Sequence, residues 1–495
     1  MATRKAFDND YYLKIQRKAI LERIKAFGDK LYLEFGGKLF DDYHASRVLP
    51  GFMPDSKLQM LLGLKDKAEI IICVNAHDIA SNKMRSDIGI TYQEDVLRLI
   101  DTFKEVGLFV SSVVISFFEE NEAIKEFMLK LENNGLKVYK TYKINGYPQN
   151  IPLIVGDEGL GHNEYVETTR PLVVVTAPGP GSGKMATCLS QLYFDNKRGI
   201  RSGYAKYETF PVWNLPLKHP VNLAYEAATV DLNDINMIDP FHLEEYGITA
   251  VNYNRDVEVF PLLKAIFEKI YGQSPYKSPT DMGVNKVGFA IRNEAKVIEA
   301  SQREIVRRYY ETRVKVFLGK LDEETLIKSE MLMNQAGVNA SKRKCVKACL
   351  DKYQESGQPS IALELANGKI ITGKRSELLG AGAAALLNAL KYLAKISDDL
   401  YLISPSVIAP LTKTKTEYLH RSYVRLRVEE ALLVLSLQVN MNPLANVALK
   451  QVSKLRGIEA HSSHILSEYD RNTFKRLGIN ITEEPQNYQK RLYYK

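Results

Sequence analysis

Blocks of apolar residues alternate with amphipathic segments along the first half of the chain. Five apolar runs are typical of strands: 30–35, 69–76, 110–118, 137–144 and 171–178. Four segments have helical spacing: 10–28, 93–106, 120–134 and 183–194. The runs EIIICVNA and PLVVVTAP are continuous, as in strands buried on both faces of a sheet. The alternation therefore predicts an α/β fold with a mostly parallel sheet.

The pattern changes after residue 204. Residues 204–290 are dense in aromatic, Pro, Asn, Asp and His residues and poor in periodicity, which predicts ordered loops that line a cleft. Residues 294–318 and 322–354 are charged and helical. A second α/β pattern begins near 358 with a hairpin about Asn367–Gly368, and the small residues of the helix at 380–396 favour close packing on a sheet.

This organisation predicts a multidomain α/β protein in three parts. We expect a Rossmann-like α/β domain at 1–290, a helical connector at 291–355 and a C-terminal α/β domain at 356–495. A chain of 495 residues is long enough for two to four domains.

Composition narrows the class of protein further. Hydrophobic residues make up 45% and charged residues 25%, which excludes disordered, collagen-like and coiled-coil chains. No apolar run is long enough to span a membrane, and MATRKAFDND is not a secretory signal. Four cysteines in so long a chain do not form a disulfide framework, so we expect a cytoplasmic protein. A net charge of +8 fits anionic small molecules as well as nucleic acid.

The sharpest motif is the glycine-rich loop in VVVTAPGPGSGKMATC, residues 173–188. A buried strand runs into glycines and then into a helix that starts near Lys184, an order that favours binding of an anion by backbone N–H groups, helix dipole and lysine. We expect the loop to bind a phosphorylated or nucleotide-like small molecule. The predicted contacts are Gly179, Gly181, Ser182, Gly183, Lys184 and Thr187, with Arg255 as a second phosphate contact.

The loop departs from a Walker A motif at two positions. Pro178 stands where the first glycine belongs, and Met185 replaces the hydroxyl that binds magnesium. A divergent NTPase therefore stays an alternative, as does a tight turn without ligand.

Candidate acid–base groups gather in residues 204–256. His219, Glu226 and Asp231 are the predicted catalytic residues, because imidazole beside carboxylates suits proton transfer. Ligands of open α/β sheets collect at the carboxyl ends of strands, so we expect these groups to face the glycine loop across one cleft. The alternative is structural: Asp231 and Asp239 are each suited to cap a helix.

Several long motifs carry a family resemblance. The segments TAPGPGSGKMATCLSQLY, YETFPVWNLPLKHPVNLAYEAATVDLNDINMIDPFHLE, VNYNRDVE and YKSPTDMGVN resemble the mostly bacterial family named domain of unknown function 1846. The resemblance covers essentially the whole chain and implies little biochemistry. Some members are labelled ATP-dependent peptidases, but the H-E-x-x-H of a zinc peptidase is absent here. The C-terminal part of the family is similar to the deaminase-like α/β fold.

Metal and nucleic-acid sites are not predicted. The H-x-E and P-C-x-x-C motifs of zinc deaminases are missing. The pairs Cys345–Cys349 and His461–His464 lack enough neighbouring ligands in sequence, although Glu468 and Asp470 follow the second pair. In residues 292–320, Glu alternates with Arg, as in a solvated helix rather than a nucleic-acid face.

These observations favour an enzyme that acts on a phosphorylated or nucleotide-like small molecule. The first alternative is a non-catalytic ligand-sensing or structural homo-oligomer, and the second is a divergent NTPase. We expect a homo-oligomer in each case. The sequence indicates no particular cofactor or substrate.

Overall fold

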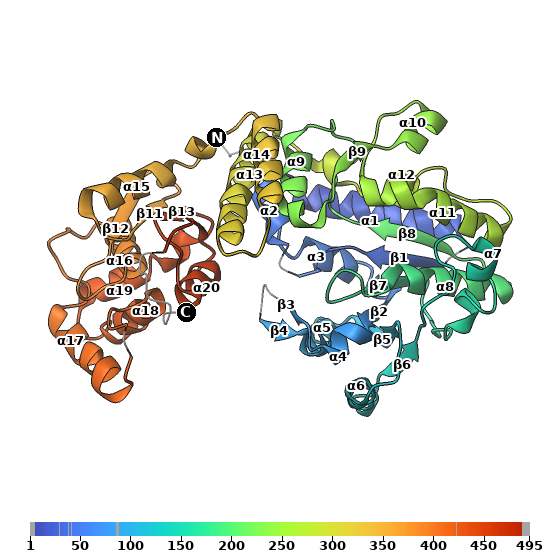
Figure 1. Cartoon of the computed structure of the whole chain (residues 1–495), viewed down its shortest axis with the longest axis horizontal. Coiled ribbons are helices and arrows are strands. Elements are labelled where there is room, and N and C mark those ends of the chain that lie inside the picture. The colour runs from blue at the N-terminus through green and yellow to red at the C-terminus, as the bar shows by residue number, and fades with distance from the viewer. Residues whose placement is uncertain are drawn as a thin grey trace. The chain divides into compact units, whose positions relative to one another are not determined.

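A computed structural model describes residues 5–28, 30–37, 39–40, 42–85, 89–421 and 423–487 (Figure 1). Its contacts divide the chain into two compact units, Met1–Ser301 and Gln302–Lys495. The three-part division expected from the sequence stays a prediction. No helix in the described parts of the chain is long and apolar enough to cross a membrane.

A six-stranded sheet forms the centre of the N-terminal unit. Its order is β6-β5-β2-β7-β1-β8, and every neighbouring pair is parallel (Figure 1). The strands are β1 (Leu31–Phe35), β2 (Ala68–Asn75), β5 (Phe109–Ser116), β6 (Lys137–Lys140), β7 (Leu172–Thr176) and β8 (Gly203–Tyr207). The predicted parallel sheet is confirmed. Its central strand β7 is completely buried, which explains the continuous apolar run.

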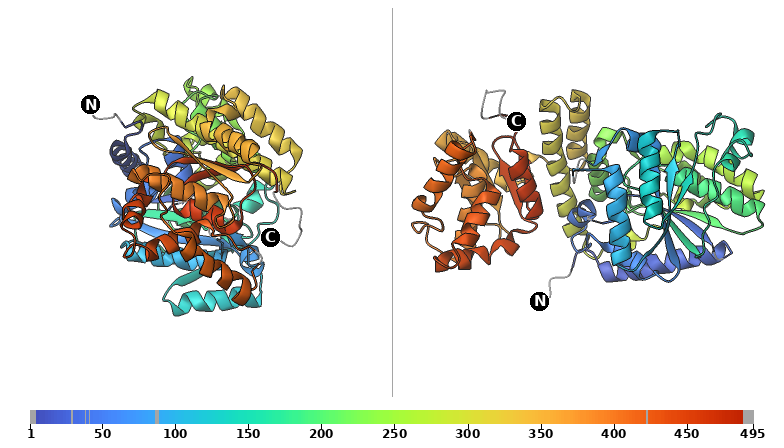
Figure 2. Two further views of the ribbon diagram at one scale, coloured as in Figure 1. Left: turned by 90° about the vertical axis from the view of Figure 1, so that its left-hand side faces the viewer. Right: turned by 90° about the horizontal axis from the view of Figure 1, so that it is seen from below.

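Helices cover both faces of this sheet (Figure 2). One face packs against α1 (Asn9–Ala26), α3 (Ser56–Leu62), α5 (Tyr92–Glu105) and α6 (Glu122–Asn133). The other packs against α7 (Ile151–Ile154), α8 (Lys184–Lys197) and α11 (Asn254–Tyr271). Each face has its own apolar core, so the unit is a doubly wound α/β domain.

The prediction of loops for residues 204–290 is wrong over part of that range. The segment contains α9 (Pro220–Ala228), β9 (Asn236–Ile238), α10 (Pro240–Tyr246), β10 (Val251–Tyr253), α11 and α12 (Pro279–Met282). Helix α11 buries Phe260, Leu263 and Phe267 against the sheet. The polar first turn of α11 and the internal Pro261 made its helical pattern difficult to recognise in the sequence. The helix forms because packing of its apolar face on the sheet outweighs this local preference. The shorter elements α2 (Tyr43–Val48), α4 (Ala76–Ala80), β3 (Met84–Arg85) and β4 (Ile90–Thr91) complete the unit.

The C-terminal unit contains a four-stranded mixed sheet of order β12-β11-β13-β14. Its strands are β11 (Ser360–Glu364), β12 (Ile370–Lys374), β13 (Glu459–Ser462) and β14 (Asn480–Glu483). Its helices are α14 (Glu323–Gln335), α15 (Lys344–Ser356), α16 (Ala381–Ala394), α17 (Pro405–Lys413), α18 (Val428–Leu437), α19 (Pro443–Leu449) and α20 (Glu468–Arg476), and α13 (Glu294–Phe317) crosses the boundary between the units.

Two predictions about this unit are confirmed. Strands β11 and β12 pair antiparallel around a turn at Asn367–Gly368, where Gly368 has a φ of +79°. Helix α16 packs so closely that a Cβ on Gly373 would lie 2.1 Å from the Ala385 nitrogen. The expected likeness to deaminases stays a prediction.

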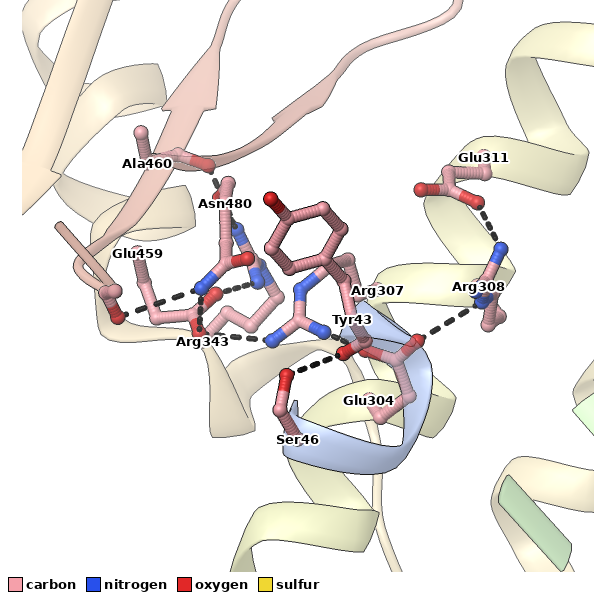
Figure 3. Close-up of polar contacts among 11 residues, drawn as sticks. Tyr43, Ser46, Glu304, Arg307, Arg308, Glu311, Arg343, Glu459, Ala460 and Asn480 are labelled. Carbon is pink, nitrogen blue, oxygen red and sulfur yellow. Dashed lines mark hydrogen bonds and ion pairs between the residues drawn. The ribbon is translucent and has the colours of Figure 1, made fainter. Parts of the chain in front are cut away.

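A buried ion network ties helices of the C-terminal unit to its sheet (Figure 3). Arg343 is 1% exposed, pairs with Glu459 and donates to the carbonyl oxygens of Ala460 (2.6 Å) and Asn480 (3.2 Å). Arg307 on α13 donates to the other Glu459 oxygen at 2.8 Å. Burial alone would raise the pKa of Glu459, but the two guanidinium groups outweigh it and lower that pKa.

Candidate functional site

The glycine loop follows the central strand β7. Helices α4 and α5, which connect β2 to β5, lie on one face of the sheet, and helix α8, which follows β7, lies on the other. The carboxyl ends of β2 and β7 therefore flank a topological switch point, where doubly wound proteins place their ligands. The loop, residues 177–183, lies at this point.

Close contacts fix the glycines of the loop. Gly181 and Gly183 have φ values of +71° and +79°, a region that favours glycine. A Cβ on Gly183 would lie 2.5 Å from Ser116 Cβ, and one on Gly179 would lie 2.2 Å from the Tyr92 hydroxyl. The spacing of the three glycines thus reflects how closely the backbone approaches β5 and α5.

The side chains beneath the loop donate hydrogen bonds to its carbonyl oxygens, and they accept none from its N–H groups. Asn75 Nδ2 donates to the Gly181 oxygen at 3.2 Å, and Ser116 Oγ donates to the Ser182 oxygen at 3.1 Å. No side chain caps α8, whose N-cap is Gly183. Among the described residues, the N–H groups of 181–186 have no protein acceptor. The loop therefore presents donors at an open helix N-terminus.

The three polar residues of the motif have different environments. Lys184 begins α8, is half-buried and makes no ion pair with the described part of the chain. Ser182 donates to the Gly179 oxygen at 2.9 Å. Thr187 donates to the Gly183 oxygen at 3.0 Å and accepts from the thiol of Cys73. Both hydroxyls are buried and engaged within the protein, so Lys184 is the side chain available to an anion.

The residues predicted as catalytic have structural partners of their own. His219 caps α9, accepting from the Val221 N–H at 3.2 Å, and its Nε2 lies 3.4 Å from Glu294. Burial lowers the pKa of His219, although Glu294 opposes this effect. Glu226 accepts from the side-chain amide of Asn236 at 3.1 Å, and burial raises its pKa. Both groups stabilise the segment that contains them.

Asp231 and Arg255 lie in the same segment. Asp231 is exposed in the turn at 230–232, and Arg255 pairs with Asp234 at 2.6 Å. The capping alternative is confirmed at Asp239, which accepts from the His242 N–H at the start of α10. The catalytic roles of His219, Glu226 and Asp231, the phosphate contact of Arg255 and the single-cleft arrangement stay predictions.

A buried polar cluster lies at the carboxyl ends of β1 and β8, and no local sequence motif indicates it. We call Glu34, Lys206, Glu208, Tyr253 and Asp256 the Lys206 cluster. Lys206 Nζ lies 2.7 Å from an Asp256 oxygen and 3.4 Å from Glu208 Oε1. The Tyr253 hydroxyl donates to Glu208 Oε2 at 2.6 Å and also contacts Lys206.

Electrostatics distinguish this cluster from an ordinary ion pair. Burial raises the pKa of Asp256 to about 6, because the opposing effect of Lys206 is offset in part by Glu208 and Glu34. Burial also disfavours the charge of Lys206, but the carboxylates outweigh it and raise the pKa of Lys206 well above its usual value.

The cluster and the loop lie at the same edge of the sheet. Strand β1 lies between β7 and β8, and Glu34 pairs in register with Val175 on one side and Lys206 on the other. Glu208 lies over Gly36, where an added Cβ would be 2.4 Å from Glu208 Cγ. Two strand spacings, about 10 Å, separate the ends of β7 and β8. The sequence analysis did not single out Glu34, although a charged residue inside the strand-like run KLYLEF is a signal that could have indicated it.

The cysteine and histidine pairs have other partners in the structure. Cys345 and Cys349 are buried free thiols, and His461 lies 2.8 Å from Thr482 Oγ1 and 3.1 Å from Glu484. Within the described ranges, no three His, Cys, Asp or Glu side chains are grouped so as to hold a metal.

The fold and the loop define a doubly wound α/β protein with a second α/β unit. The family model for domain of unknown function DUF1846, N-terminal, matches residues 5–337, and that for its C-terminal domain matches residues 341–494. The chain is 52% identical over 490 residues to a UPF0371 protein of Streptococcus pyogenes serotype M5, covering 99% of both chains. It is 51% identical over 492 residues to a UPF0371 protein of Streptococcus pneumoniae strain JJA, covering 99% of this chain and 100% of the relative. The chain belongs to this family of unknown function.

Proposed function

We propose that the protein binds the phosphoryl group of a small phosphorylated or nucleotide-like molecule on the glycine loop and acts on that molecule as an enzyme. The observation that carries the proposal is the uncapped N-terminus of α8 at the switch point. Backbone donors, the helix dipole and the Lys184 ammonium all favour an anion at that place.

The loop is preorganised for this ligand. Asn75 and Ser116 hold two loop carbonyls by hydrogen bonds, which keeps these oxygens from competing for the exposed donors. A phosphate bound there replaces water on groups that no protein atom satisfies. A hydrogen bond from a charged donor such as Lys184 is worth about 1.5–3 kcal/mol, or roughly 10- to 100-fold in affinity.

Ligand-dependent thermal stability tests the proposal. Inorganic phosphate, AMP and sugar phosphates would be screened against the wild type, Lys184→Ala and the control Lys197→Ala. Lys197 ends the same helix, about 20 Å from its start, and its exposed ammonium pairs with Asp157. A ligand at 100 times its Kd adds about 2.7 kcal/mol of stability. We expect this gain in the wild type and control but a much smaller one in Lys184→Ala.

Two outcomes would contradict the proposal. The first is that no phosphorylated compound stabilises the wild type. The second is that the ligand stabilises Lys184→Ala as much as the wild type, which would mean that the anion does not bind at the loop.

A further inference from the structure

Helix α18 of the C-terminal unit is apolar on both its inner and its outer face. The inner face lies in the apolar core of the unit and consists of Val428, Ala431, Val434 and Leu435. On the outer face, Leu433 and Leu437 are 60% and 76% exposed. A helix at the surface of a globular protein normally has a polar outer face, and a helix that is apolar all round is normally covered. The outer face of α18 therefore needs an explanation.

The exposed apolar surface extends beyond the end of α18. The helical path continues to Asn442, whose N–H donates to the Gln438 oxygen at 2.8 Å. Met441 therefore lies one turn beyond Leu437. The Asn442 side chain donates to the Tyr401 carbonyl oxygen at 3.3 Å, which brings the segment before α17 beside this turn. We call Leu400, Tyr401, Leu433, Leu437 and Met441 the Leu437 patch, and each of them is between 43% and 81% exposed.

The chemistry of the Leu437 patch narrows what can cover it. Residues 431–449, which include the whole outer face of α18 from its second turn, contain no Asp, Glu, Lys or Arg. A nucleic acid requires Lys and Arg at its binding surface, and a helix that lies in a membrane surface has them beside its apolar face. An apolar protein surface covers the patch without burying an unpaired charge. The uncharged stretch therefore favours a protein partner.

The size of the Leu437 patch fits a contact between two copies of the chain. With about 200 Å² for a fully exposed residue of this size, the exposed fractions correspond to about 650 Å². A stable interface of standard size buries roughly 800 Å² per partner, as an apolar core within a polar rim. The patch supplies such a core, and the exposed residues Glu429, Ser436 and Asn440 supply part of the rim. A two-fold dimer needs only one patch of this kind, because both copies present it.

We propose that two copies of the protein pair through the Leu437 patch, with their α18 helices antiparallel across a two-fold axis. The spacing of the apolar residues along the helix sets the register. An axis at Leu437 places this side chain against the partner's Leu437. Leu433, one turn before the axis, then meets Met441 of the partner subunit, one turn after it. The inference is independent of the function proposed for the glycine loop.

Sedimentation equilibrium of the full-length protein tests the pairing. At about 10 µM we expect the wild type to have the mass of at least two chains. Leu437→Glu places two carboxylates together in an apolar contact, so it is expected to weaken the association on the order of 100-fold and to give a smaller mass. Leu437 is largely exposed in the single chain, so the far-UV circular dichroism of this variant should match that of the wild type. The control Leu129→Glu changes a leucine on α6 that is 57% exposed and is expected to keep the wild-type mass.

Disulfide cross-linking tests the register. The natural cysteines are buried, so an introduced exposed cysteine is the one that oxidises. Packed helices lie about 8–10 Å apart, which brings facing Cα atoms within the roughly 6 Å that a disulfide spans. We expect Leu437→Cys to form a covalent dimer under mild oxidation. Leu433→Cys is expected to cross-link far less, because its two copies are displaced by about 12 Å along the helices, and the control Leu129→Cys is expected to stay unlinked.

Three results would overturn this inference. The first is a wild type that stays monomeric at about 100 µM, which would mean that a different molecule or another part of the same chain covers the patch. The second is an assembly whose mass Leu437→Glu leaves unchanged, because the copies then meet through another surface. The third is a dimer in which Leu437→Cys does not cross-link, because the two-fold axis then does not pass at Leu437.

Discussion

Gly183 shows how one residue determines the shape of the loop. Its φ of +79° costs an L-residue about 1–2 kcal/mol, and its position against Ser116 leaves no space for a methyl group. We expect Gly183→Ala to lower the free energy of unfolding by roughly 3 kcal/mol, measured by urea titration.

Gly199 is the matched control for this substitution. It has a φ of +71°, but an added Cβ there meets no atom within 4 Å. We expect Gly199→Ala to cost only about 1–2 kcal/mol, from backbone strain alone. Equal costs for the two substitutions would show that the contact with Ser116 is not tight.

Asp256 predicts a particular dependence of stability on pH. Its pKa is raised from 3.8 to about 6 in the folded protein, so the folded state binds the proton more tightly than the unfolded state. The resulting stability is fully present below pH 3.8 and is lost as pH rises through 6. Relative to Asp256→Asn, the wild type is therefore expected to lose on the order of 1–3 kcal/mol between pH 4 and pH 7.

Urea titrations of both proteins across this pH range provide the measurement. The comparison with Asp256→Asn removes the contributions of the other carboxylates that both proteins share. A stability difference that stays constant, or that grows in favour of the wild type as pH rises, would show that folding does not raise the pKa of Asp256.

At the scale of elements, the sequence predicts those strands and helices that have a clear hydrophobic period. Strands β2 and β7 and helix α5 follow their patterns closely, because each buries a continuous run or a single face. Strands β13 and β14, with the sequences EAHS and NITE, are short and polar and carry no such signal. Their pairing depends on β11 and on helices distant in sequence.

The network around Arg343 gives an element-scale prediction for the C-terminal unit. Removal of one partner from a buried ion pair leaves the other charge uncompensated, at a cost of about 3–5 kcal/mol. Arg343→Met also removes the hydrogen bonds to the carbonyls of Ala460 and Asn480. We expect it to lower the free energy of unfolding of this unit by that amount, measured by denaturant titration.

Lys352→Met on α15 serves as the control. Lys352 is 31% exposed and pairs with Glu355, which is largely solvated, so we expect a change below about 0.5 kcal/mol. A cost below 1 kcal/mol for Arg343→Met would mean that the network contributes little to packing of α13 and α15 on the sheet.

At the scale of the whole molecule, the glycine loop could be predicted from the sequence, whereas the Lys206 cluster could not. The glycine loop is contiguous in sequence, so its strand, turn and helix could be recognised together. The Lys206 cluster joins residues 34, 206, 208, 253 and 256, which become neighbours only because β1 pairs with β8 and α11 returns across them. No local pattern encodes that strand order. Homo-oligomerisation depends on contacts between copies of the chain, and a structure of one chain does not test it. It stays a prediction.

A crystal structure of the full-length protein grown with sulfate at pH 6.5 tests the central claim most directly. The account predicts one sulfate at the start of α8, with its oxygens within about 3 Å of the N–H groups of 183–185 and of Lys184 Nζ. A loop that stays empty in sulfate, or whose N–H groups are capped by a side chain of the protein, would contradict the assignment of the glycine loop as an anion site.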